Sequence, residues 1–110
     1  MTDWKKTFEK ELQMAAEARA RGNEGQARVC ARRAAGAVVR EYFEREGRSL
    51  RSPSAYDLLN DLLTIEDLPD RARLAAQYLT QRVSEEFSLP EEIDLLREAR
   101  NLAASLLPQD

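Results

Sequence analysis

Histidine is absent from this 110-residue sequence, and cysteine occurs only once, at Cys30. Without histidine the chain has no Ser-His or Cys-His nucleophile pair, no imidazole general base and no histidine-containing zinc site. A single cysteine permits neither an internal disulfide nor a thiolate metal cluster, so we interpret the chain as a reduced, intracellular protein. We therefore expect no catalytic residue, no bound metal and no cofactor.

Several other signals are also missing. No apolar run is long enough to span a membrane, and the first residues, MTDWKKTFEKE, lack the apolar segment of a signal peptide. Runs of alternating β-branched residues and Asn-Gly turns, which would indicate a sheet, are absent. The sequence also lacks a G-x-x-x-x-G-K-[ST] phosphate loop. We expect a cytoplasmic protein without membrane contact that is built from helices.

Helical periodicity runs through almost the whole chain. Hydrophobic residues make up 43% of the sequence and charged residues 34%, which is typical of a single globular domain, here residues 1–110. Short polar breaks separate the periodic segments, and short connections favour antiparallel neighbours. The prediction is an all-α, up-down antiparallel bundle of five helices, four long and one short.

Cap and turn residues indicate where these helices begin and end. In chain order, the signals are Thr2 or Asp3, Gly22-Asn23, Gly47, Ser52-Pro53, Asp67-Leu68-Pro69 and Ser88-Leu89-Pro90. The expected apolar face of the first helix consists of Trp4, Phe8, Leu12, Ala15 and Ala16, and that of the third of Ala55, Leu58, Leu59, Leu62 and Leu63. The face of the fourth helix consists of Ala72, Ala75, Ala76, Leu79 and Val83. The face of the fifth consists of Ile93, Leu96, Ala99, Ala103, Leu106 and Leu107.

The second expected helix, residues 24–46, is apolar on two sides. A wide wedge holds Ala27, Ala31, Ala34, Ala35, Val38 and Tyr42, and a wet stripe of Arg33, Arg40 and Glu44 separates it from a second patch. The second patch consists of Val29, Gly36, Val39 and Phe43. A helix of a five-helix bundle should keep one face exposed to solvent, but this patch would make that face apolar. We therefore predict that the patch is the interface of a homodimer. The alternative is that another helix of the same chain covers it.

Glu41 falls inside the apolar wedge of the second helix. A carboxylate at such a position has to be paired or has to reach solvent. Arg45 is four residues further along, which is the spacing of a helical ion pair. We therefore predict a structural salt bridge between Glu41 and Arg45.

Charge is unevenly distributed along the chain. Residues 19–51 contain nine arginines and four glutamates, a net charge of +5, whereas residues 52–110 have a net charge of −7. Such polarity suits either an anion-binding side or two complementary surfaces packed together, and we favour the second. If an anion binds, the candidate residues are Arg28, Arg32, Arg40, Arg45, Arg48 and Arg51.

The order of elements and four short motifs resemble the HEPN ("higher eukaryotes and prokaryotes nucleotide-binding") domain family. Residues 31–40, ARRAAGAVVR, resemble the family's helix-two pattern A-x-Q-A-A-E-x-A-L-K, with Arg33 and Gly36 in place of its Gln and Glu. The entry into that helix, from Ala18 through Gly22-Asn23 to Ala27, is also similar. Tyr56-Asp57-Leu58 and Arg82-Val83-Ser84 stand near the family's His-x-Leu and Arg-Tyr-Pro motifs.

The resemblance implies a helical bundle, dimerisation, and partnership with a nucleotide or a nucleotidyltransferase-like protein. Ribonucleases of the family use an Arg-x(4–6)-His motif, which a chain without histidine cannot contain. We therefore predict a non-catalytic HEPN-like module that acts by protein-protein interaction, either with a nucleotidyltransferase-like partner or as a nucleotide-responsive regulator. The alternative is an RNA- or nucleotide-binding protein that uses the arginine group.

Overall fold

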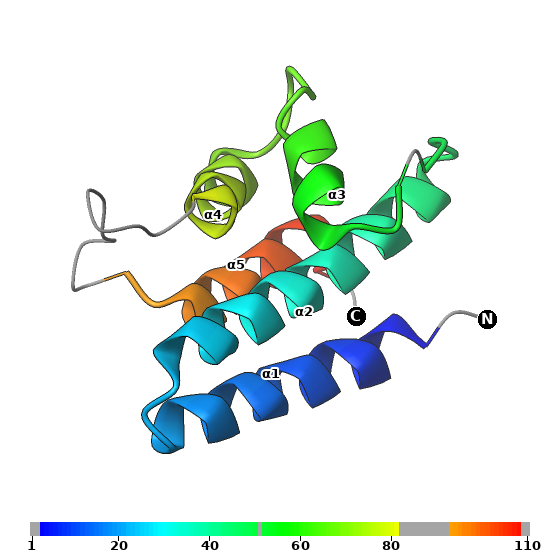
Figure 1. The fold of residues 1–110 in the computed structure, drawn as a ribbon. Coiled ribbons are helices and arrows are strands. Elements are labelled where there is room, and N and C mark those ends of the chain that lie inside the picture. Colours follow the sequence, from blue (N-terminus) through cyan, green and yellow to red (C-terminus); the bar gives the residue numbers. More distant parts are fainter. Residues whose placement is uncertain (1–2, 51, 82–92, 109–110) are drawn as a thin grey trace.

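A computed structural model describes residues 3–50, 52–81 and 93–108, and these residues form five α-helices connected by loops and turns (Figure 1). The helices are α1 (Trp4–Ala20), α2 (Glu24–Arg45), α3 (Ala55–Leu62), α4 (Asp70–Thr80) and α5 (Leu95–Leu106). The described part of the chain contains no strand, so the predicted all-α bundle is confirmed. No helix within those ranges combines the length and apolarity needed to cross a bilayer.

The long hairpin of α1 and α2 begins and turns where the sequence signals place it. The Asp3 carboxylate accepts a hydrogen bond from the Lys6 amide and caps α1. Gly22 has φ +80°, a conformation that favours glycine, and Asn23 then caps α2 by accepting from the Gln26 amide. The chain therefore reverses within three residues and packs α1 antiparallel to α2.

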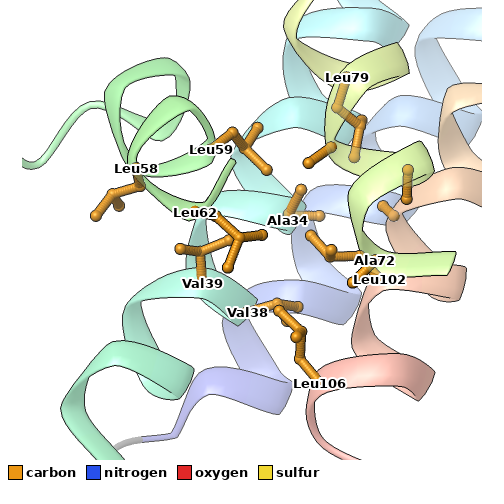
Figure 2. Packing of buried hydrophobic residues seen from close by; sticks show 14 of the residues in the cluster. Ala34, Val38, Val39, Leu58, Leu59, Leu62, Ala72, Leu79, Leu102 and Leu106 are labelled. Carbon is orange, nitrogen blue, oxygen red and sulfur yellow. The ribbon is translucent and has the colours of Figure 1, made fainter. Parts of the chain in front are cut away.

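Helix α2 is the central element of the bundle, since it contacts each of the other four helices. Helices α1 and α5 flank it, and α3 and α4 lie over its other side (Figure 1). One continuous core results, in which Val38, Val39, Leu59 and Leu102 are fully buried. Figure 2 shows Val39 of α2 directed toward Leu62 of α3, so α3 covers a part of α2.

Among the last three helices, only α4 begins where the sequence predicted it. Helix α3 begins two residues after Pro53, because the Ser54 hydroxyl caps it by accepting from the Asp57 amide. Helix α4 begins directly after Pro69, as predicted, without a side-chain cap. Helix α5 begins at Leu95 with Asp94 as its cap; the predicted start at residues 88–90, and Val83, lie outside the described residues.

Two buried faces are also rotated relative to the prediction. In α1, Ala18 is buried and Ala16 is exposed, because the helix turns its later residues toward the α2 hairpin. In α5, Leu95 and Leu102 are buried, whereas Leu96 is only partly buried. Both differences amount to rotations of a predicted apolar stripe about the helix axis.

Candidate binding cleft

The second apolar patch of α2 is covered by α3 of the same chain. Val39 is 0% exposed and Phe43 is 3% exposed, and both belong to the core. Gly36 is buried against Ala55, at the first residue of α3. Of the four predicted interface residues only Val29 is exposed, at 37%. The exposed apolar strip expected from the sequence is therefore not there, and the alternative, cover by a helix of the same chain, describes this side of α2.

The predicted arginine group does not converge on one place. Arg28 and Arg45 are seventeen residues apart, which corresponds to about 25 Å along the helix. Arg45 donates to Glu41 at 2.7 Å, which confirms the predicted salt bridge at the end of α2. Arg48 lies in the exposed loop beyond α2, and Arg51 lies outside the described residues.

Arg32 donates hydrogen bonds to backbone carbonyls at the end of α4. Its Nε donates to the Leu79 carbonyl at 2.7 Å, and its Nη2 to the Gln81 carbonyl at 3.5 Å. The last carbonyls of a helix have no partner within the helix, so a cation that donates to them stabilises the helix end. Arg32 is thus half-buried and structural in this fold, and its donors are turned toward the protein.

A cleft of about 370 Å³ opens where α1, α2 and the start of α3 meet, and we call it the α2 cleft. Two arginines, two small hydroxyl side chains, a glycine and four apolar or small residues line it. They are Thr7, Arg33, Gly36, Ala37, Arg40, Pro53, Ser54, Ala55 and Leu58. The cleft thus combines an apolar floor with two positive charges.

The contact between Gly36 and Ala55 creates this cleft. A Cβ atom on Gly36 would lie only 2.6 Å from the Ala55 Cβ, so glycine permits the first turn of α3 to approach the α2 backbone closely. Arg33 and Arg40 are seven residues apart, so nearly two helical turns bring them to the same side of α2, about 10 Å apart along its axis. One therefore lies on each side of the glycine along that axis.

Neither arginine of the cleft has a carboxylate partner among the described residues. Arg40 donates only to the Pro53 carbonyl, at 3.5 Å, and Arg33 is exposed without a hydrogen-bond partner in the described chain. Arg19 and Arg100, by contrast, form two-pronged ion pairs with carboxylates. The α2 cleft therefore presents positive charge that no carboxylate of the described residues neutralises.

The described residues that line this cleft include no Asp, Glu, Cys, Lys or Tyr, so none of them is an ordinary general acid or base. The Ser54 hydroxyl is engaged as the cap of α3. Throughout the described ranges, no three Cys, Asp or Glu side chains gather closely enough to hold a metal ion. The arrangement is suited to binding an anionic group.

A second groove lies between the start of α1 and the end of α5. Trp4, Phe8 and Leu107 line it, and Trp4 and Phe8 pack edge to face with ring centroids 5.8 Å apart. The Arg100 guanidinium lies over the Phe8 ring, 5.7 Å from its centroid, and also binds Glu9. Its charge is thus neutralised within the chain, which distinguishes this groove from the α2 cleft.

No protein-family model matches the chain, and neither the curated proteins nor the solved structures contain a match to it. The candidate site therefore rests on this chain alone. Arg40 lies in the cleft and was predicted to bind an anion. Arg33 also lies in the cleft, but the sequence prediction did not include it among the anion-binding residues. Its seven-residue spacing from Arg40 and its place in the wet stripe were the available signals.

Proposed function

We propose that this protein is a non-catalytic, HEPN-like helical module that acts by binding another protein through the α2 cleft. The observation that carries the proposal is the pair Arg33 and Arg40, two guanidiniums without carboxylate partners in the described chain, beside an apolar floor. Arginine is enriched at protein interfaces and among the residues that contribute most to binding. A nucleotidyltransferase-like protein is the class of partner that the HEPN resemblance suggests.

The competing function, binding of RNA or a nucleotide, has less support from the described residues. Its predicted arginine group is divided between the two ends of α2, and Arg32 is engaged with the end of α4. Bases are usually held by stacking on aromatic side chains. None of the described residues that line the α2 cleft is aromatic.

Photo-crosslinking in cells tests the proposal. A photoreactive phenylalanine derivative replaces Ala37, in the cleft, and in a matched variant replaces Arg97, an exposed residue on α5. We expect a discrete crosslinked protein from position 37 only, and expect Arg33→Met with Arg40→Met to remove it. The identified protein, once purified, should bind the wild-type chain at least tenfold more tightly than the double variant.

Two results would contradict the proposal. One is identical crosslinking from positions 37 and 97, because this would show that no partner binds specifically at the cleft. The other is cleavage of RNA or turnover of a nucleoside triphosphate by the purified chain at a rate that follows the protein peak through two chromatographic steps.

A further inference from the structure

We infer that the α2 cleft recognises an extended, acidic peptide segment with two carboxylates three residues apart, one on Arg33 and one on Arg40. This inference rests on the proposed function and specifies the chemistry of the partner. The spacing of the two arginines, the lining of the surface between them and the charge of the whole chain support it.

The spacing of the arginines selects the spacing of the acids. Arg40 is seven positions after Arg33 on α2, which places their backbone positions about 10 Å apart along the helix axis. Three residues of a chain in the extended polyproline II conformation cover about 9 Å, since this conformation rises about 3.1 Å per residue, and its three residues per turn place residues i and i+3 on the same side. An E-x-x-E segment that runs along α2 thus brings one carboxylate to each guanidinium, and arginine binds carboxylates with two parallel hydrogen bonds.

The surface between the arginines selects small apolar residues between the acids. Gly36 and Ala37 of α2 form the floor there, and Ala55 and Leu58 of α3 form one wall. A cleft of about 370 Å³ holds a few side chains, whereas a whole helix about 10 Å in diameter needs a wider groove. We therefore expect alanine, valine or a residue of similar size at the two middle positions.

Overall charge argues for a peptide and against a nucleic acid. The protein has a net charge of −3, so the molecule as a whole does not attract a long polyanion. A short segment with two carboxylates meets only the local positive charge of Arg33 and Arg40. The described residues that line the cleft also include no aromatic side chain on which a base could stack.

The test is a titration of the full-length protein, followed by amide chemical shifts in NMR. The probe is the acetylated and amidated hexapeptide Ala-Glu-Ala-Val-Glu-Ala, and the matched probe has Gln in place of both Glu. We expect saturable shifts concentrated at Arg33, Ala37, Arg40 and Ala55, with binding at least tenfold weaker for the Gln peptide. Moving the acids to adjacent positions should weaken binding several-fold.

Protein variants show whether the two arginines are the receptor. Arg33→Met and Arg40→Met should each weaken binding of the Glu peptide at least fivefold. Arg97→Met, the same change at an exposed residue of α5, should leave binding of that peptide unchanged. A double variant with Arg33→Glu and Arg40→Glu should instead bind the hexapeptide in which Lys replaces both Glu. Helical circular dichroism of every variant should match the wild type, because these arginines lie at the surface.

Several outcomes would overturn the inference. Equal binding of the Glu and Gln peptides would do so, as would shifts spread evenly over α5. Stronger shifts of the same residues by inorganic phosphate, ATP or a ten-nucleotide uridine RNA would assign the cleft to phosphate instead. If a crosslinked protein binds through Arg33 and Arg40 but the peptide does not bind, this inference fails while the proposed function stands. If the peptide binds but no protein is crosslinked, the proposed function fails while the cleft still recognises the acidic peptide.

Discussion

Gly36 of α2 lies in direct contact with Ala55 of α3: a Cβ atom on Gly36 would be 2.6 Å from the Ala55 Cβ and 3.0 Å from its Cα. Atoms this close would have to move apart, so the packing of α3 favours glycine in the middle of this 22-residue helix. Glycine costs about 0.5–1 kcal/mol there relative to alanine. The close packing of α3 on α2 offsets that cost.

Gly36→Ala should therefore destabilise the protein although alanine is the better helix former. We expect a net loss of about 1–3 kcal/mol, because the overpacking outweighs the gain in helix propensity. Urea unfolding followed by circular dichroism measures it. Gly25→Ala is the control, since only the Asn23 Oδ1 lies near a Cβ at that position, at 3.9 Å. That variant should be neutral or slightly more stable, and a Gly36→Ala protein as stable as the Gly25→Ala protein would contradict the contact.

Arg32 and Arg33 are neighbours in the sequence with separate tasks. Arg32 donates to carbonyls at the end of α4, whereas Arg33 lines the α2 cleft. Arg32→Met should lower the free energy of unfolding by about 1–3 kcal/mol, because buried carbonyls lose a charged donor. It should leave binding of the acidic hexapeptide unchanged.

Arg33→Met should have the opposite profile. Its unfolding midpoint should match the wild type within about 0.5 kcal/mol, since the side chain is exposed, and its peptide binding should be at least fivefold weaker. Measuring both variants by the same denaturation and titration makes the comparison direct. If both lose stability equally, Arg33 is not a free binding group.

The ion pair between Arg19 and Glu24 makes stability depend on pH. Arg19 donates to both oxygens of Glu24, at 3.1 Å and 2.9 Å, and these hydrogen bonds lower the pKa of the Glu24 carboxyl, while burial opposes the shift. A carboxyl whose pKa is lowered in the folded state stabilises that state above its unfolded pKa of about 4.3. The stabilisation is lost as the pH falls through the folded pKa.

Glu24→Gln should therefore reduce stability at neutral pH, and the difference from the wild type should disappear under acid conditions. Both side chains are more than a third exposed, so we expect about 1 kcal/mol or less at low salt. Urea midpoints between pH 7 and pH 2.5 measure this difference. Glu66→Gln, at an exposed glutamate side chain without a described ion pair, should leave the midpoint near that of the wild type at every pH. A Glu24→Gln deficit that persists at pH 2.5 would show that another property of the variant causes it.

Local signals in the sequence were enough to predict the helices. Periodic leucines such as Leu58, Leu59 and Leu62 mark a buried face wherever they pack, and Asp3 and Asn23 are caps that act within three residues. Those predictions depend on neighbours along the chain. They were therefore accurate except at helix starts and in the rotation of two faces.

The binding cleft depended on contacts between distant residues, which periodicity does not report. A helical wheel shows that α2 is apolar on two sides, but it does not say whether α3 or a second subunit covers the patch around Val39. Likewise, Arg32 reaches a carbonyl 47 residues away, and Arg33 becomes part of a cleft only because α3 begins beside Gly36. Topology, and not composition, decides those roles.

Val39 provides the clearest test of which element covers α2. The side chain is 0% exposed and packs against α3, so Val39→Glu would place a carboxylate in the core without a partner. We expect a loss of more than about 4 kcal/mol, a large part of the stability of a domain this size, together with a loss of helical signal near room temperature. Val29→Glu is the control on the same helix, since Val29 is 37% exposed, and it should retain the wild-type unfolding midpoint within about 0.5 kcal/mol. Circular dichroism and size-exclusion chromatography with light scattering distinguish the possibilities. If Val39→Glu keeps its full helical content and only lowers the molar mass of the particle, then a second subunit, and not α3, covers this side of α2.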